Sequence, residues 1–275
     1  MKPANPLGQK TIYLSQYDAG LLFSIPRAIA REQLLLKDDL PFVGEDCWTG
    51  YEISWLDNHG KPQVRLAEFH FDYDSPNIVE SKSFKLYLNS FNQTYFENED
   101  AVVQQMQHDL SAASGKPCRL VFYQACDAAA LAIADLPGRC IDDIDVSINN
   151  YEPNPELLKV NPSTQIEGGI IYSHLLKTNC PVTGQPDWAT VFVEYSGNEI
   201  DAASLLAYVI SFREHQDFHE NCVERLFCDI QQYCQPTELS VCARYTRRGG
   251  LDINPLRTNA IDSQISKLDL RISRQ

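Results

Sequence analysis

Apolar and polar residues alternate with a period of two in two stretches of the chain. VRLAEFHFDY (residues 64–73) and ATVFVEY (189–195) carry apolar side chains at alternate positions, which is the pattern of a β-strand with one buried face. CRLVFY (118–123) and LSVCARYT (239–246) are shorter runs of residues that favour strands. We therefore predict strands in all four stretches.

Three other stretches repeat their apolar residues at helical spacing. DAASLLAYVISF (201–212) places its large apolar residues on one face of a helix. Its first residue, Asp201, is a suitable N-cap. EDAVVQQMQHDL (99–110) and CVERLFCDIQQY (222–233) are amphipathic as well. We predict helices in all three.

The order of these elements occurs twice, as expected for a degenerate internal duplication. In each half, two strands joined by a turn precede two helices and a further strand. EDCWTG (45–50) parallels TNCPVTG (178–184), which aligns Cys47 with Cys180. The next pair of parallel segments is LYLNSFNQTYFEN (86–98) and AYVISFREHQDFHEN (207–221).

Between the halves lies a stretch rich in proline, asparagine and acidic residues, 141–169, and we take part of it as a linker. The pattern predicts the α+β class, with two similar modules over residues 1–150 and 151–275. Each module is expected to hold a mainly antiparallel sheet with helices packed on one face.

Composition narrows the range of partners and compartments. The 275 residues carry a formal net charge of −14 at pH 7, which argues against a general nucleic-acid-binding protein because such surfaces are basic. The longest apolar stretch, ACDAAALAIADL (125–136), is too short to span a bilayer. The first twenty residues lack the apolar core of a signal peptide. We therefore expect a cytoplasmic protein that does not contact the membrane.

The nine cysteines do not form a recognisable ligand pattern. No CxxC pair occurs, and the six-residue spacing of Cys222, Cys228 and Cys234 does not match common zinc sites. Because cytosolic thiols stay reduced, we expect free cysteines, most of them packed in the core, and no metal site. The Rossmann, P-loop and HExxH motifs are absent as well.

Cys180 and Asp187 lie seven residues apart on either side of a Pro/Gly turn. An ordinary thiol is only about 3% ionised at neutral pH. A carboxylate that accepts the thiol proton leaves a thiolate beside a neutral acid, and such a pair suits nucleophilic addition to a polar multiple bond. The alternative is a buried thiol at a strand end and a turn residue without a catalytic role.

Two basic segments are suited to anionic ligands. VESKSFKLY (79–87) holds Lys82 and Lys85 three positions apart, with serines that can donate to phosphate oxygens. RYTRRGGLDINP (244–255) joins arginines to a Gly-Gly turn whose backbone can approach a phosphate. The alternative is a solvated helix start and an ordinary loop.

DFHEN (217–221) adds His219, which can move protons near neutral pH. Its neighbour Glu220 can accept two hydrogen bonds from the amidine-like edge of a heterocycle. Taken singly, this histidine is equally consistent with a structural role.

Together, ESKSFKLYLNSF, the spacing of Cys180 and Asp187, FHE and RRGGLDINP resemble the NADPH-dependent 7-cyano-7-deazaguanine reductases of queuosine biosynthesis, in their long, two-module form. The resemblance covers nearly the whole chain and implies tandem modules of the tunnel fold. It implies reduction of a nitrile to the primary amine of 7-aminomethyl-7-deazaguanine through a covalent thioimide on the cysteine. NADPH is the implied cofactor, with two molecules used per turnover.

The same resemblance assigns roles to individual residues. The implied catalytic residues are Cys180, Asp187 and His219. The implied substrate-binding residues are Val79, Glu80, Ser81, His219 and Glu220. The implied cofactor-binding residues are Ser81, Lys82, Arg248 and Gly249. The expected partners are a small deazapurine and, by analogy, a second copy of the chain in a homodimer, with no nucleic acid bound directly.

Two other functions stay open. A tunnel-fold pterin or purine hydrolase would use a reactive thiol without needing the lysines of 79–87 or the turn at Arg248. A non-catalytic purine-binding module would need neither Cys180 nor Asp187.

Overall fold

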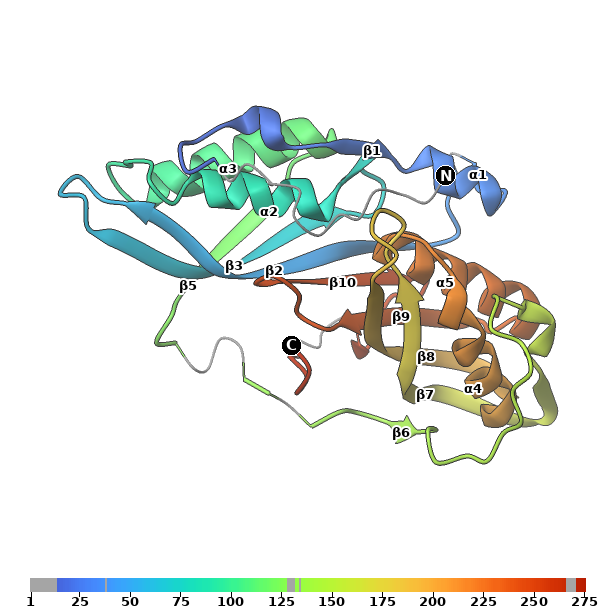
Figure 1. The fold of residues 1–275 in the computed structure, drawn as a ribbon. Helices are drawn as coiled ribbons and strands as arrows, with labels where there is room; N and C mark the ends of the chain where they lie inside the picture. The colour runs from blue at the N-terminus through green and yellow to red at the C-terminus, as the bar shows by residue number, and fades with distance from the viewer. Residues whose placement is uncertain (1–13, 38, 128–131, 134, 266–270) are drawn as a thin grey trace.

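The fold is known from a computed structural model, which describes residues 14–37, 39–127, 132–133, 135–265 and 271–275. Eight strands form one continuous sheet in the order β5-β3-β2-β10-β9-β8-β7-β6 (Figure 1). Every neighbouring pair is antiparallel except the short β6–β7 pair. The predicted α+β class with mainly antiparallel pairing is therefore confirmed.

The two halves of the chain share a central order of two long strands, two helices and a further strand. The N-terminal half contains β1 (Ser24–Pro26), α1 (Ala28–Gln33), β2 (Val43–Leu56), β3 (Pro62–Asp72), β4 (Asn77–Val79), α2 (Ser81–Ser90), α3 (Glu99–Ser114) and β5 (Arg119–Gln124). The C-terminal half contains β7 (Val160–Asn179), β8 (Pro186–Ile200), α4 (Ala202–Ser211), α5 (His219–Cys234), β9 (Glu238–Tyr245) and β10 (Leu251–Thr258), with β6 (Arg139–Cys140) before them. The predicted strands and helices are confirmed. Asp201 caps α4 through a hydrogen bond from the Ser204 N–H.

The alignment of Cys47 with Cys180 is wrong at the level of structure. Cys47 lies inside the long strand β2, which continues without a turn to Leu56. Cys180 instead follows the last residue of β7, where the β7–β8 hairpin begins to turn. The similar sequences around Cys47 and Cys180 therefore occupy different positions in the two hairpins.

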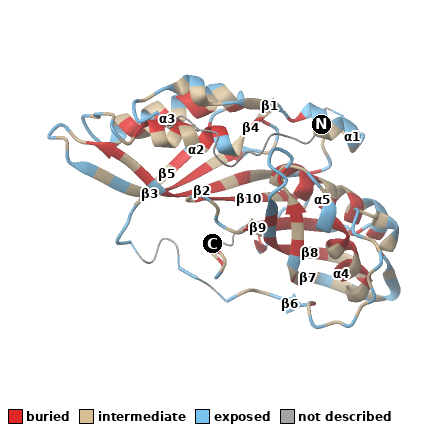
Figure 2. Ribbon diagram, in the orientation of Figure 1, coloured by how far each residue is buried: buried red, intermediate tan, exposed pale blue. Residues whose placement is uncertain are grey.

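β10 joins the halves into one sheet. It lies in the C-terminal half of the chain and pairs with β2 over its whole length, from Leu251 opposite Gly50 to Thr258 opposite Val43. The helices of both halves cover one face of this sheet, where two large apolar clusters form the core. Buried residues accordingly follow the central strands in Figure 2. The contact between β2 and β10 therefore brings residues about 200 positions apart to one place.

The proposed boundary between residues 150 and 151 falls between β6 and the 3-10 turn Pro155–Leu157. The last part of the acidic stretch 141–169 belongs to β7, which begins at Val160. The division into modules 1–150 and 151–275 stays a prediction. The first thirteen residues and part of the apolar stretch 125–136 lie outside the described residues. Within the described part of the chain, no helix has both the length and the apolar character needed to cross a bilayer.

Candidate active site

A pocket opens where the two halves meet, beside the junction of β2 with β10. It encloses about 510 Å³, counted out to its open mouth. The side chains that line it come from β2, from the β4–α2 corner, from the β7–β8 hairpin, from the start of α5 and from the β9–β10 turn. The predicted site residues among them are Val79, Ser81, Cys180, Asp187, His219, Glu220 and Arg248. The fold thus gathers most of the sequence-predicted residues in one place.

The β7–β8 hairpin explains the spacing of the cysteine and the carboxylate. In its register Asn179 lies opposite Pro186, so Cys180 opens the connecting turn and Asp187 stands on the returning strand. The Cys180 N–H donates to the Gln185 carbonyl at 2.9 Å, which closes the turn. The turn therefore brings Cys180 and Asp187, which lie seven residues apart in the sequence, to the wall of the same pocket.

The environment of Cys180 favours its thiolate. Burial acts to raise the pKa of this thiol, but hydrogen bonds from the Thr183 hydroxyl and from the backbone N–H groups of Thr183 and Val182 lower it below its usual value. The charge of Asp187 acts in the opposite direction. The donors of the turn, rather than the carboxylate, are therefore what stabilise the sulfur anion. The sequence interpretation missed Thr183.

Asp187 is held by two partners. Its Oδ1 lies 2.8 Å from Nη1 of Arg248, and its Oδ2 lies 3.3 Å from Nε2 of His219. The ring of His219 stacks on Tyr245 with the centroids 3.7 Å apart and the planes 6° from parallel. Burial lowers the pKa of His219 in spite of the neighbouring carboxylate. Burial therefore favours the neutral form of His219, whose ring lies beside the acid on one side.

Glu220 is a buried carboxyl group in the first turn of α5. Only 2% of the residue is exposed, and burial, with the charge of Asp46 behind it, raises its pKa to about 7. A carboxyl group in such a place gains from any ligand that donates hydrogen bonds to its charged form. Glu220 is therefore suited to accept the donors of a bound heterocycle.

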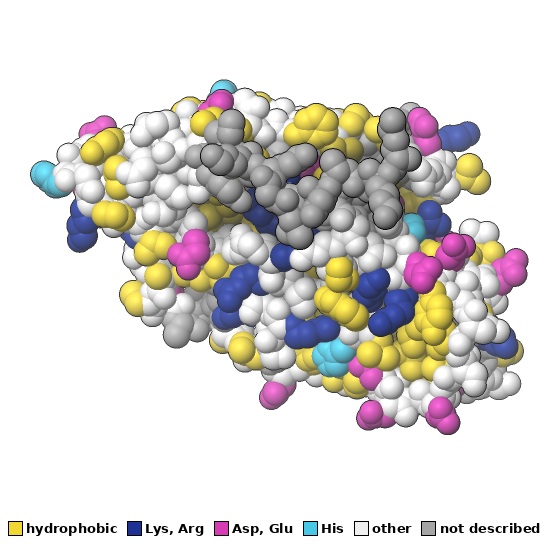
Figure 3. Space-filling view, viewed as in Figure 1, with side chains coloured by type: hydrophobic (Ala, Val, Ile, Leu, Met, Phe, Trp, Pro, Cys, Tyr) yellow, Lys and Arg dark blue, Asp and Glu magenta, His cyan; other side chains and the backbone are white. Residues whose placement is uncertain are grey.

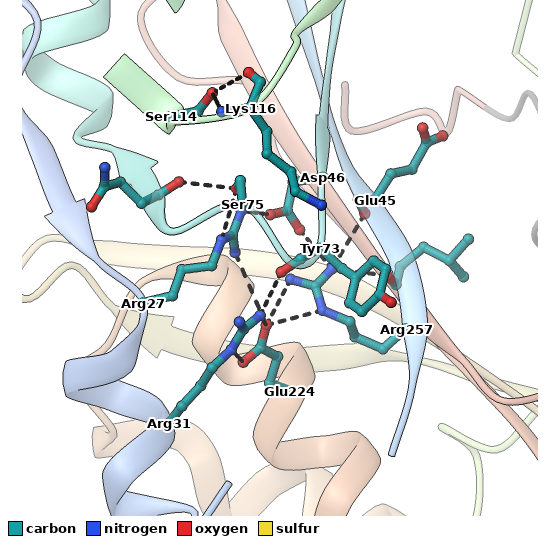
Figure 4. A network of polar contacts seen from close by, with 12 residues as sticks. Arg27, Arg31, Glu45, Asp46, Tyr73, Ser75, Ser114, Lys116, Glu224 and Arg257 are labelled. Atoms are coloured by element: carbon teal, nitrogen blue, oxygen red, sulfur yellow. Dashed lines mark hydrogen bonds and ion pairs between the residues drawn. The ribbon is translucent and has the colours of Figure 1, made fainter. Parts of the chain in front are cut away.

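A buried network of charges fixes the position of α5 behind the pocket (Figure 4). Glu224, one helical turn after Glu220, accepts hydrogen bonds from Arg31 at 2.7 and 2.9 Å and from Arg257 at 2.9 and 3.1 Å. Arg257, which is fully buried on β10, also binds Asp46 of β2 at 2.7 Å. The network links the N-terminal and C-terminal halves, so the start of α5 is held against both.

Two of the predicted residues lie outside the pocket, and one of them, Glu80, has another role in this structure. The Glu80 carboxylate caps α2, accepting the N–H groups of Lys82 at 2.8 Å and of Ser83 at 2.7 Å. Neither Glu80 nor Lys82 lines the pocket, and the next lysine on the helix, Lys85, does. Capping explains why a glutamate precedes this helix. The assignments of Glu80 to the substrate and of Lys82 to the cofactor stay predictions.

Lys85 and Arg248 form a positive corner of the pocket. Burial lowers the pKa of Lys85, and the charge of Arg248 adds to the effect. Gly249 does not line the pocket but lies against Lys85, since a Cβ built there would stand 3.4 Å from Lys85 Cδ. Its φ of +64° is one that side chains rarely adopt. Figure 3 shows basic side chains gathered near the middle of the face of the molecule that it draws. The corner therefore fits an anionic group.

The sequence interpretation missed most of the remaining wall. The additional lining residues are Trp48, Pro181, Asp217, Phe218, Thr246, Leu251, Asp252 and Ile253. Trp48 and Ile253 face each other across the β2–β10 pair. Their part in the pocket follows from a pairing between distant strands, so no local signal in the sequence could have found them.

Comparison with known proteins shows the family of this chain. Residues 13–122 match the family model described as nitrile reductase, 7-cyano-7-deazaguanine-reductase N-term, and residues 186–263 match the model described as QueF-like protein. The chain is 55% identical over 270 residues, 98% of each chain, to a protein of Bordetella parapertussis named NADPH-dependent 7-cyano-7-deazaguanine reductase. The chain belongs to the 7-cyano-7-deazaguanine reductase family. Proteins of the same name from Hydrogenovibrio crunogenus and Burkholderia lata are 56% and 53% identical over 254 and 255 residues.

The two family models leave residues 123–185 unmatched. The first ends within β5, and the second covers β8 to the segment after β10. The pocket of this 7-cyano-7-deazaguanine reductase family member draws residues from both matched regions, with Val79 and Ser81 in the first and Asp187, His219, Glu220 and Arg248 in the second. Cys180 lies between them.

Proposed function

We propose that the protein reduces the nitrile of 7-cyano-7-deazaguanine to the primary amine, with NADPH as the reductant, as a step in queuosine biosynthesis. The observation that carries the proposal is the meeting of Cys180, Asp187, His219 and Glu220 in one pocket beside the positive corner of Lys85 and Arg248. The shared family and the names of the relatives support it.

Cys180 is the proposed nucleophile. Its thiolate, favoured by the donors of its own turn, adds to the nitrile carbon and forms a C–S bond. The nitrile nitrogen takes one proton, which gives a covalent thioimide. Asp187 lines the same pocket and is the proposed proton carrier, which takes the thiol proton of Cys180 and passes it to the nitrile nitrogen.

Glu220 is the proposed acceptor for the base. The guanine-like edge of the substrate carries a ring N–H and an amino group, and one carboxylate can accept a hydrogen bond from each. Pairing with these donors favours the ionised form of a carboxyl group whose pKa burial has raised to about 7. Val79 and Ser81 line the same pocket and complete the proposed base site.

Arg248 and Lys85 are the proposed contacts for the phosphates of NADPH, with Gly249 allowing a close approach of the backbone. Ser81 and Lys82 at the start of α2 are the further residues proposed to hold the cofactor. NADPH supplies hydride, and conversion of a nitrile to an amine takes two.

The fold of the two modules, their association and their compartment are proposed as well. We propose tandem tunnel-fold modules that associate as a homodimer in the cytoplasm, without direct contact to nucleic acid. The repeated order of elements and the open edge at β5 support association between sheets. All nine cysteines, each within the described residues, are free, as expected in a reducing compartment.

The decisive experiment follows NADPH absorbance with 7-cyano-7-deazaguanine for the wild type, Cys180→Ala and the control Cys126→Ala. The wild type and the control, which changes an exposed cysteine outside the pocket, are expected to oxidise NADPH at similar rates, and Cys180→Ala to lose the activity. Mass spectrometry without NADPH is expected to show an adduct on Cys180.

Full activity in Cys180→Ala would refute the nucleophile assignment. Nitrile consumption without NADPH oxidation would instead indicate a hydrolase. Binding of the nitrile without turnover or adduct would indicate a binding module.

A further inference from the structure

A second group of reactive side chains lies away from the pocket, on the face of the sheet opposite the helices. Cys47 on β2 stands directly opposite His70 on β3 in the strand register. Glu68 precedes His70 by two residues and therefore points to the same face. The alternate residues Trp48 and Phe69 point the other way, into the core under the helices. A thiol, an imidazole and a carboxylate thus meet on one face.

The three side chains are close enough to share one ion. One ligand atom from each of Cys47, Glu68 and His70 lies within 4.8 Å of the other two, and His70 Nε2 lies 3.7 Å from Glu68 Oε2. In a tetrahedral zinc site, bonds of about 2.0–2.3 Å place neighbouring ligand atoms roughly 3.3–3.8 Å apart. The spacing requires only a small contraction around a metal ion.

Hydrogen-bond partners of His70 and Glu68 already orient these two side chains for metal binding. His70 Nδ1 lies 3.1 Å from Glu45 Oε2, which leaves Nε2 as the ligand atom. His70 Nε2 is buried and has no hydrogen-bond partner among the described residues. The Tyr123 hydroxyl donates to Glu68 Oε2 at 2.7 Å. Metal-binding histidines commonly donate their other ring N–H to a carboxylate, and metal-binding carboxylates commonly accept a further hydrogen bond, which orients both ligands.

We propose that Cys47, Glu68 and His70 form a site for a thiophilic divalent cation, Zn²⁺ by preference, with water in the fourth position. Such an ion would bridge β2 and β3 on the face that the helices leave uncovered, and so would stabilise the fold. The proposal is independent of the proposed enzymatic function.

Two arginines near the site bear on its affinity. Arg119 lies 3.7 Å from Glu45, and the charge of Arg244 acts on both Cys47 and Glu68. These cations weaken the binding of a metal ion, and the carboxylates of Glu45 and Glu68 oppose them. Burial raises the pKa of Cys47, whereas burial acts to lower the pKa of His70 but hydrogen bonds with Cys47, Glu45 and Glu68 raise it to about 11. The metal ion therefore has to displace one proton from Cys47 and one from His70 as it binds.

A comparable cluster at Cys140, Asp142 and His174 provides the natural comparison. There Asp142 already accepts hydrogen bonds from the Ser173 hydroxyl at 2.6 Å and from the His174 N–H at 3.0 Å, and Cys140 is exposed. The carboxylate is thus committed to the backbone of β7. We therefore assign the metal to the Cys47 cluster.

The test is titration of metal-free full-length protein with Co²⁺, a spectroscopic substitute for Zn²⁺. We expect one Co²⁺ per chain and a thiolate-to-cobalt charge-transfer band in the near ultraviolet. Cys47→Ala is expected to lose the band, and His70→Ala to bind at least tenfold more weakly. Cys140→Ala and Cys180→Ala are expected to keep it. Far-ultraviolet circular dichroism establishes that each variant is folded.

A second measurement does not depend on the absorption of bound cobalt. Zn²⁺ is expected to raise the melting temperature of the wild type and of Cys140→Ala, but not that of Cys47→Ala, because an ion that binds only the folded state stabilises it. A wild type without a thiolate band, a band retained in Cys47→Ala, or a band lost in Cys140→Ala would overturn the assignment.

Discussion

At the scale of single residues, the charge of each group in the pocket depends on its neighbours more than on its type. Hydrogen bonds from Thr183 and Val182 lower the pKa of Cys180, whereas burial raises that of Glu220. Burial favours the neutral form of His219 against the pull of Asp187. The free pocket therefore offers a thiolate-prone sulfur and a protonatable acceptor within one cavity.

The role of Thr183 leads to a prediction. Thr183→Val removes the hydroxyl donor to the Cys180 thiolate, and a hydrogen bond to a charged group is worth about 1.5–3 kcal/mol. The pKa of Cys180 is expected to rise, and alkylation of this thiol by iodoacetamide at neutral pH is expected to slow by about tenfold or more. Mass spectrometry of Cys180 over a range of pH measures both effects.

Thr183→Ser keeps the hydroxyl and is the matched control, with alkylation close to the wild-type rate. Equal rates for the valine and serine variants would show that the backbone donors alone stabilise the thiolate.

At the scale of secondary-structure elements, α5 carries the site and is fixed by charges rather than by apolar packing alone. Its first turn presents His219 and Glu220 to the pocket, and its second turn places Glu224 among three arginines. Each of these guanidiniums depends on a carboxylate for compensation, since an unpaired buried charge is costly. The network therefore transmits any shift of β2 or β10 to the start of α5.

Breaking this network is expected to destabilise the protein strongly. Glu224→Gln leaves Asp46 as the one buried carboxylate beside three guanidiniums, and breaking such a buried ion pair costs about 3–5 kcal/mol in the free energy of unfolding. Urea denaturation at neutral pH measures the loss. The control Glu99→Gln, at the half-exposed ion pair with Arg65, is expected to cost less than about 1 kcal/mol.

The effect of Glu224→Gln should also depend on pH. Burial acts to raise the pKa of Glu224, but the neighbouring arginines lower it below its usual value of 4.5. Its contribution to stability is therefore complete above pH 4.5 and is lost as the pH falls through the lower pKa of the folded state. The difference in the free energy of unfolding between the wild type and the variant is expected to decrease only in that acidic range. A gap that narrowed near neutral pH would contradict this account.

At the scale of the whole molecule, an acidic protein has to attract an anionic cofactor. The net charge of −14 repels NADPH, whereas Lys85 and Arg248 place two basic side chains on one wall of the pocket. Basic side chains that gather at one place can attract an anion to an acidic protein. The continuous sheet makes this arrangement possible, because it places α2 of one half beside the β9–β10 turn of the other.

NADPH binding is therefore expected to weaken as salt is added. The Debye length falls from about 10 Å at 0.1 M to about 3 Å at 1 M ionic strength, so the Kd measured by NADPH fluorescence should rise with NaCl. Lys85→Met is expected to bind more weakly and to show a smaller salt dependence, whereas Lys61→Met, at an exposed turn, behaves as the wild type. Indifference of the wild type to salt would count against the positive corner.

Local order along the chain was sufficient to predict several of its elements and to single out several residues that line the pocket. Alternation and helical spacing arise from contacts within a few positions, so the strands at 64–73 and 189–195, the helix at 201–212 and the Asp201 cap could be derived without the fold. The motif residues Cys180, Asp187, His219 and Glu220 also stand in short, readable segments.

Only the tertiary structure determined which groups these residues contact. The donors to Cys180, the capping of α2 by Glu80 and the position of Lys85 in the pocket depend on the path of the backbone. Trp48 reaches the pocket only through the β2–β10 pair, and Cys47 meets His70 only through the β2–β3 register. Hydrophobic periodicity determines which face of a strand is buried, but it does not determine which strand lies beside it.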